Sequence, residues 1–160
     1  MYNKYEELND DARDYFLVWL ANKIKDDDVL TRCKKEVDLI YDKVLLFFIE
    51  FLHKYKETEK SVSFHFRGMA NNLLLLHVIG ISKVDPVKYN LPYELFADKI
   101  LCIDFINGFT DKHLFVIRKN VGYVRRGYDG YDQYFNLEID PDSYNCFVEY
   151  EAASFDWGNW

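Results

Sequence analysis

The sequence predicts an α+β fold in which N-terminal helices pack on a mostly antiparallel sheet. Apolar residues recur every three or four positions in residues 1–60, which is the spacing of helices. From residue 61 onward, short apolar or alternating runs are separated by Gly, Asp and Pro, which is typical of strands joined by turns. Helices first and strands later favour α+β over an alternating α/β arrangement. We expect the 160 residues to form one domain, with a helical part (1–60) and a β-rich part (61–160).

Two helices are predicted in the helical part. The first is expected to begin after Asn9 and Asp10, because either side chain can act as an N-cap, and to end near the acidic run 26–28. The second is expected to run without interruption over five turns, because its apolar residues form one continuous face. These residues are Val37, Ile40, Val44, Phe47, Phe51 and Tyr55.

The β-rich part begins with an alternating run at 62–66, which predicts a strand. The Leu run at 73–76 predicts a short buried helix that ends at Gly80, and a partly helical piece is expected within 89–96. Residues 100–106 are apolar around a single Asp, which suits a central strand. Further strands are expected at 114–117, 121–125, 134–139 and 146–150.

Composition excludes several classes of protein. No run of about 18 apolar residues is present, so no membrane-spanning helix is expected. The N-terminus is acidic from the start, unlike a signal or transit peptide. The three cysteines are odd in number and widely spaced, which indicates reduced thiols and a cytoplasmic protein.

Segments in the middle of the chain form a specific pattern. An Arg-Gly turn and a Leu run occupy residues 67–74, and residues 80–91 read Gly-Ile-x-x-Val-Asp-Pro-x-Lys-Tyr-Asn-Leu. Tyr-Glu-Leu-Phe follows at 93–96. This order resembles the palm region of the alpha subunit of bacterial DNA polymerase III, in which a Gly-Ser turn precedes a similar Val-Asp-Pro segment. The resemblance covers residues 30–107 and implies a palm-like architecture.

The departures from that family bear on catalysis. The family carries two carboxylates two residues apart on its acidic strand, which the segment 103–105 resembles at its end. Aligning that segment places Ile100 and Cys102 where the resemblance implies the two carboxylates. Neither side chain offers the hard oxygen ligands that Mg²⁺ requires. Met69 stands where the family has the serine of its Gly-Ser turn, so the resemblance implies a palm without its catalytic site.

One alternative retains a metal-binding site. A slipped register would make Asp104 a metal ligand, with Asp140 or Glu138 on a later strand as its partner. Such a site would support a minimal Mg²⁺-dependent nucleotidyltransferase or a nucleotide binder. Under the preferred reading no cofactor and no metal are expected.

The remaining candidates are weaker. No complete catalytic motif is present, neither a P-loop nor a nucleophile elbow, and the four histidines lack zinc-site spacing. Arg118, Lys119, Arg125 and Arg126 form the one basic cluster. Because the net charge is −7, we interpret the cluster as a solvated face and do not expect direct nucleic-acid binding.

The acidic character of the chain sits in its last 34 residues. After Arg126 there is no Lys or Arg, whereas eight acidic residues and ten aromatic residues occur there. An acidic surface with Tyr and Trp anchors suits a basic protein partner, because carboxylates can take the place of phosphates. The residues expected to bind the partner are Tyr128, Asp129, Tyr131, Asp132, Tyr134, Asp156, Trp157 and Trp160.

The function expected from these observations is binding rather than catalysis. The chain is predicted to inhibit a basic nucleic-acid-handling protein, a nuclease or a polymerase, by acting as a nucleic-acid mimic. A phage anti-defence protein and a toxin-immunity protein both fit this description. The alternatives are the Mg²⁺-dependent nucleotide site at Asp104 and an accessory protein of a replicative polymerase.

Overall fold

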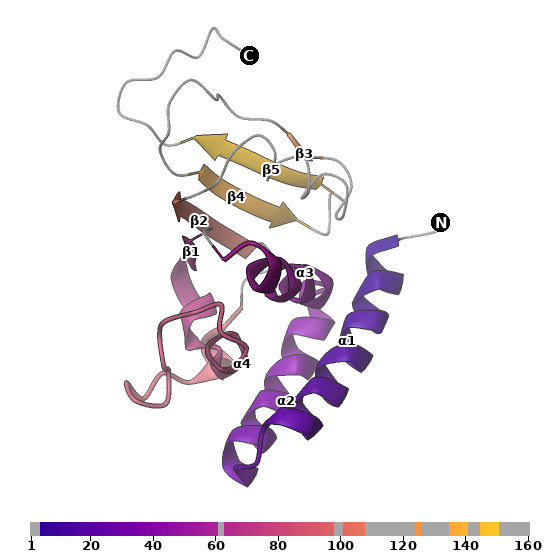
Figure 1. Cartoon of the computed structure of the whole chain (residues 1–160), viewed down its shortest axis with the longest axis vertical. Helices are drawn as coiled ribbons and strands as arrows, with labels where there is room; N and C mark the ends of the chain where they lie inside the picture. The colour runs from indigo at the N-terminus through magenta and orange to yellow at the C-terminus, as the bar shows by residue number, and fades with distance from the viewer. Residues whose placement is uncertain are drawn as a thin grey trace, which may run out of the picture.

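The computed structural model describes residues 4–60, 63–97, 101–107, 124–125, 135–140 and 145–150, and the side chains within 6–60, 63–97 and 101–103. The helices are α1 (Lys4–Lys23), α2 (Asp27–Asp42), α3 (Leu46–Thr58) and the short α4 (Leu74–Val78). Two 3₁₀ turns, η1 (Gly68–Asn72) and η2 (Tyr93–Leu95), flank the loop after α4. The strands are β1 (Ser63–Phe66), β2 (Leu101–Asn107), β3 (Val124–Arg125), β4 (Phe135–Asp140) and β5 (Asn145–Tyr150). The fold is therefore α+β, as the sequence predicts (Figure 1).

The first predicted helix boundary is wrong. Helix α1 begins at Lys4, so Asn9 lies inside the helix and not at its start. Asp26, in contrast, is the N-cap of α2, and its side chain accepts hydrogen bonds from the backbone N–H groups of Asp28 and Val29 at 2.9 and 3.1 Å. The acidic run 26–28 thus starts α2, three residues after α1 ends.

The predicted second helix is two helices. The helical conformation is interrupted between α2 and α3 at Val44, whose φ of 57° lies in the left-handed region. Backbone N–H groups of Val44 and Leu45 donate to Tyr41 and Ile40, which closes α2 with a left-handed cap. A β-branched residue is unusual in this conformation, so the residue type did not indicate the interruption. The apolar spacing did not indicate it either, because it continues through Val44.

Asn9 closes the start of α3 from a distance. The residue before α3, Leu45, has no polar side chain with which to cap the helix. The Oδ1 atom of Asn9 instead accepts hydrogen bonds from the N–H groups of Leu46 and Phe47 at 2.8 and 3.3 Å. Its Nδ2 atom donates to the carbonyl of Tyr41 at 2.9 Å. One buried amide on α1 therefore fixes both sides of the α2–α3 break.

The described strands form one sheet in the order β1-β2-β4-β5-β3. The pairs β1–β2, β2–β4 and β4–β5 are antiparallel, and β3 runs parallel to β5. Strand β2 is paired on both sides, so the prediction of a central strand at 100–106 is confirmed. The predicted strands at 62–66, 134–139 and 146–150 are confirmed within two residues. That at 121–125 is confirmed only at Val124–Arg125, and the one at 114–117 lies outside the described residues.

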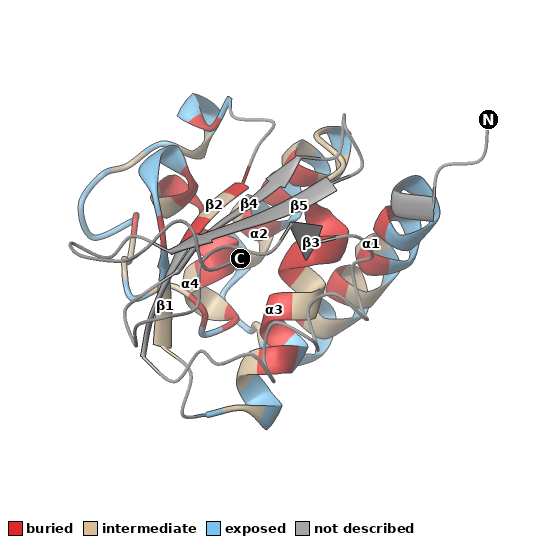
Figure 2. Cartoon of the chain, turned by 90° about the horizontal axis from the view of Figure 1, so that it is seen from above, coloured by how far each residue is buried: buried red, intermediate tan, exposed pale blue. Residues whose placement is uncertain are grey.

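A continuous apolar core joins the helices to the sheet. Buried residues of α1, α2, α3 and α4 belong to the same cluster as Phe66 of β1 and Leu101 and Ile103 of β2. Figure 2 shows the buried residues on the sides of the three long helices that face the interior. In the described part of the chain, no helix has both the length and the apolar composition needed to cross a membrane.

Replacing Asn9 by Ala is expected to lower the free energy of unfolding by about 2 kcal/mol, because two buried N–H donors at the start of α3 lose their acceptor. Asn22→Ala is the matched control, since Asn22 is exposed on the same helix and should change stability by less than about 0.5 kcal/mol. Urea denaturation of both variants measures the difference. Equal losses in the two variants would show that Asn9 does not cap α3.

Candidate functional site

The register of β2 places the sequence-predicted carboxylates relative to one another. Asp104 pairs with Asn136 on β4, and Cys102 pairs with Glu138. Glu138 is therefore diagonal to Asp104, and such positions lie about 7–8 Å apart between Cα atoms. Asp140 is four residues beyond Asn136, about 13 Å along the strand. Of the two partners considered for Asp104, Glu138 occupies the closer position.

The same register divides the sheet into two sets of positions. Leu101 and Ile103 of β2 are buried in the core, whereas Cys102 between them is half-buried. Positions 102, 104, 136 and 138 thus share the face opposite the core, because paired residues lie on the same side of a sheet. Strand β1, the other neighbour of β2, places His65 in register with Asp104, and His65 is exposed.

A half-buried thiol occupies the position where the resemblance implies a metal-binding carboxylate. Cys102 carries no hard oxygen ligand, and the carboxylate nearest to it in register belongs to the neighbouring strand. Among the residues that the structure describes, no group of three or more His, Cys, Asp or Glu side chains is placed to hold a metal ion. The side chains of Asp104, Glu138 and Asp140 lie outside that described set.

The Gly turn that precedes the Leu run follows β1 directly. Gly68 has a φ of 71°, a conformation that glycine adopts without strain, and the N–H of Arg67 donates to the carbonyl of Cys102 at 3.0 Å. Met69, which stands where the family has serine, is 46% exposed. The turn therefore lies beside β2 and presents a thioether where the resemblance implies a hydroxyl.

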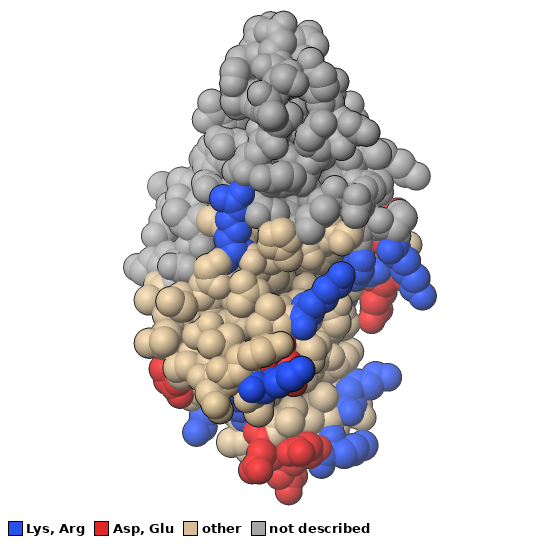
Figure 3. Space-filling view, turned by 90° about the vertical axis from the view of Figure 1, so that its left-hand side faces the viewer, with Lys and Arg blue, Asp and Glu red and all other residues tan. Residues whose placement is uncertain are grey.

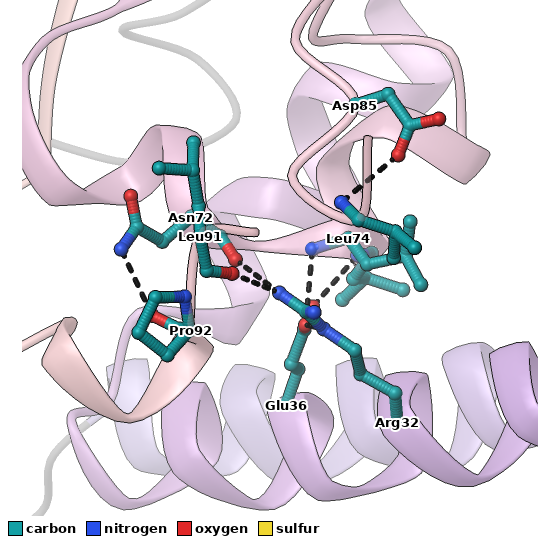
Figure 4. Close-up of polar contacts among 9 residues, drawn as sticks. Arg32, Glu36, Asn72, Leu74, Asp85, Leu91 and Pro92 are labelled. Atoms are coloured by element: carbon teal, nitrogen blue, oxygen red, sulfur yellow. Dashed lines mark hydrogen bonds and ion pairs between the residues drawn. The ribbon is translucent and has the colours of Figure 1, made fainter. Parts of the chain in front are cut away.

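The best-defined polar cluster links α2 to this turn region (Figure 4). Glu36 of α2 has no exposed surface, and its carboxylate accepts hydrogen bonds from the N–H groups of Leu74 and Leu75 at 3.0 and 2.7 Å. Arg32, one turn earlier, donates from Nε to the same carboxylate at 2.8 Å. Helix α4 has no side-chain cap of its own at Leu73, so Glu36 supplies it.

The arginine of this pair extends the cluster to the Val-Asp-Pro segment. Its NH2 group donates to the carbonyls of Asn72 and Leu91, each at 2.8 Å. The Nδ2 atom of Asn72 donates in turn to the carbonyl of Pro92 at 2.8 Å. We call Arg32, Glu36 and Asn72 the α2 anchor. It ties the chain on both sides of residues 80–91 to one face of α2.

The energetics of the α2 anchor follow from burial. Burial raises the pKa of the Glu36 carboxyl, while the hydrogen bonds from Leu75, Arg32 and Leu74 act in the opposite direction. A buried charged pair of this kind contributes little net stability when complete, but removal of one partner leaves an uncompensated group that costs about 3–5 kcal/mol. The α2 anchor therefore specifies position rather than adding a large stabilisation.

Residues of the polymerase-like segment 80–91 have structural roles that explain their types. The Asp85 side chain accepts from the N–H of Val87 at 3.1 Å, which is an Asx turn. Pro86 is buried, and its carbonyl accepts from the N–H of Leu91 at 2.8 Å. Asn90 has a φ of 54°, which Asn tolerates better than most residues. Gly80, with a φ of 85°, ends α4 as predicted.

A shallow pocket of about 360 Å³ lies beside the α2 anchor. Its walls carry charges of both signs, from Asp28, Arg32, Lys35 and Glu94, together with the Tyr93 ring. The Arg32 guanidinium lies 5.6 Å from the centre of that ring and is already bonded to three acceptors. The arrangement holds η2 against α2.

All eight residues predicted to bind a partner lie outside the described residues: Tyr128, Asp129, Tyr131, Asp132, Tyr134, Asp156, Trp157 and Trp160. The α2 anchor, in contrast, was not predicted. A signal for it was present, because Glu36 falls on the stripe of Cys33, Val37 and Ile40, all of which are buried. A charged residue within an apolar stripe indicates a buried pair.

A helical part that leads into a Gly turn, a Val-Asp-Pro segment and a central strand is the arrangement expected of a polymerase-like domain. A model of the bacterial DNA polymerase III alpha NTPase domain family matches residues 5–100. This chain belongs to that family. The match includes α1, which the sequence resemblance left out, and ends just before β2. Comparisons with curated proteins and with solved structures find no match.

Replacing Glu36 by Ala is expected to destabilise the protein by about 3 kcal/mol or more, because Arg32 and the start of α4 lose a buried partner. Asp38→Ala is the matched control, since Asp38 is 63% exposed and forms a 3.5 Å ion pair with Arg13 on the surface. That change should cost less than about 1 kcal/mol. Chemical denaturation compares the two, and similar losses would contradict the role given to Glu36.

Proposed function

We propose that this chain is a non-catalytic binding protein, derived from a polymerase III alpha framework, that engages a basic nucleic-acid-handling protein through its acidic, aromatic C-terminal segment. The observation that carries the proposal is the charge distribution: no Lys or Arg follows Arg126, while eight acidic residues do. Carboxylates in that number attract a surface evolved for phosphates, and Tyr and Trp supply the anchoring contacts. Inhibition is the expected result, because the partner's nucleic-acid groove would be occupied.

The described part of the chain supports a scaffold role for the family motifs. The Gly turn, the Leu run and the Val-Asp-Pro segment are held by the α2 anchor and by their own backbone bonds. The face seen in Figure 3 carries Lys and Arg side chains scattered over a mainly uncharged surface, with acidic side chains gathered at its lower end. The acidic bias of the chain lies instead in the sequence after Arg126.

Neutralising three C-terminal carboxylates tests this proposal. The immobilised protein should retain a basic nuclease or polymerase from a host lysate at low salt and release it at high salt. The variant Asp129→Asn/Asp132→Asn/Asp156→Asn should bind that partner about tenfold more weakly and with a shallower salt dependence. The variant Asp27→Asn/Asp28→Asn/Asp38→Asn carries the same charge change on exposed positions of α2 and should bind normally.

Either of two results would contradict the proposal. If both triple variants bind alike, the C-terminal carboxylates do not form the contact. If the retained protein is a replicative polymerase subunit that salt does not release, an accessory role in replication replaces inhibition.

A second candidate function is Mg²⁺-dependent nucleotide binding, and the strand register favours it. Glu138 pairs with Cys102, so the neighbouring strand brings a carboxylate beside the position where the family's carboxylate is missing. Asp104 is diagonal to Glu138 on the same face. Carboxylates at diagonal positions of neighbouring strands can share one Mg²⁺ ion and hold a triphosphate through it.

Calorimetric titration with ATP, with Mg²⁺ or with EDTA, tests the second candidate. Binding should require Mg²⁺, should be lost in Asp104→Ala and should strengthen in Cys102→Asp, which returns a carboxylate to β2. Asp38→Ala, on the exposed side of α2, should bind as the unaltered protein does. Absence of binding in both the unaltered protein and Cys102→Asp would exclude this function.

A further inference from the structure

Helix α1 carries more apolar residues than its core contact uses. Residues 15–20 are all apolar, and six consecutive positions point to every side of a helix with 3.6 residues per turn. Ala12, Phe16 and Leu20 form the buried stripe. Val18, on another side, is 62% exposed. Tyr15, Leu17 and Trp19 pack against the core as partly buried residues, so Val18 is the residue of this apolar run that the core leaves uncovered.

The outer side of α1 forms a groove. A hollow of about 490 Å³ is lined by Asp11, Asp14, Tyr15, Val18, Trp19, Asn22 and Lys23. Figures 1 and 2 place α1 at the edge of the molecule, with α2 and α3 on its inner side. Tyr15 and Trp19 are only half-buried and form one wall together with Val18. The groove thus offers an aromatic and aliphatic centre on the exposed side of the helix.

On this side of α1, acidic residues precede Val18 in the sequence and basic residues follow it. Asp11 and Asp14 lie before Val18, and neither forms an ion pair with a described residue. Lys23, the last residue of α1, and Lys25, in the loop that follows, lie after Val18 and are exposed. From Asp11 to Lys23 the helix rises about 18 Å, with Val18 near the middle. Negative charge therefore precedes the apolar centre and positive charge follows it.

This order is self-complementary in an antiparallel arrangement. If two copies of α1 cross at Val18, Asp11 of one copy comes toward the end of α1 in the other, where Lys23 and then Lys25 follow Val18. Asp14 then comes opposite Asn22 and next to Lys23. Two-fold symmetry repeats each contact, as in an isologous interface. A purely basic partner would be repelled by Lys23, so the charge pattern favours a second copy over such a partner.

We propose that the α1 groove is a self-association surface, in which two copies of this chain pair their α1 helices antiparallel about Val18. The pairing covers Val18, Tyr15 and Trp19 and matches acidic and basic ends across the two-fold axis. It leaves the C-terminal segment unused, so it does not rest on the proposed function. The residues to be substituted, 11, 14, 18, 23 and 25, are exposed and do not belong to the core, so changes there should leave the fold intact.

Sedimentation of the full chain over a range of concentrations tests the proposal. The unaltered protein should show a concentration-dependent dimer that weakens with added salt, because exposed charges contribute to it. Val18→Ser should weaken the dimer at least tenfold. Asp11→Lys/Asp14→Lys should abolish it, and so should Lys23→Asp/Lys25→Asp, because each variant then places like charges opposite each other.

Mixing the two charge-reversal variants provides the decisive result. One copy then carries only basic ends and the other only acidic ends, so a heterodimer should form although neither variant dimerises alone. Lys34→Asp/Lys35→Asp, a control with the same charge change on exposed positions of α2, should leave the dimer intact. Circular dichroism confirms that each variant is folded.

Two outcomes would overturn the proposal. A monomer at every concentration would mean that something other than a second copy covers the groove. A dimer that survives both charge reversals and Val18→Ser would place the interface on a different surface.

Discussion

The buried carboxylate of Glu36 is the constraint on which the arrangement of the described chain depends. It receives the guanidinium of Arg32 and two backbone donors at the start of α4, so three elements meet at one side chain. Arg32 carries the connection on to Asn72 and Leu91. A carboxylate without exposed surface must have all its hydrogen bonds satisfied by protein groups. The segment that bears the polymerase-like motifs is therefore held in one position against α2.

Capping of a helix by a polar side chain of an earlier helix occurs twice in the described chain. Helices α3 and α4 both follow a leucine, which cannot cap them, and both are capped by a polar residue of an earlier helix. Asn9 is 37 residues from Leu46, and Glu36 is 38 residues from Leu74. In each case a helix start that is weak alone becomes stable once the earlier helix has packed. Formation of these helices is thus coupled to tertiary assembly, because an isolated short helix is marginal in water.

Membership of the polymerase III alpha NTPase domain family accounts for the motif segments, but their contacts here are internal. Asp85 and Asn90 shape a turn, and Gly80 ends a helix. The positions that face away from the core on β2 carry a thiol at 102 and a carboxylate at 104, with Glu138 on the next strand. The turn and cap contacts serve folding, and they are needed whether or not these positions hold a metal ion.

The sequence by itself determined the fold class, the strand that the structure has at Ser63–Phe66, the short helix ended by Gly80 and the central position of β2. Each of these depends on local periodicity or on a residue type with a local conformational preference. Tertiary structure alone decided the break at Val44, the start of α1 and the capping roles of Asn9 and Glu36. Apolar spacing continues through the break, and the two caps reach helices more than 35 residues away. Local rules describe what a residue does to its own neighbours in the chain, and these contacts exist only after distant helices have packed together.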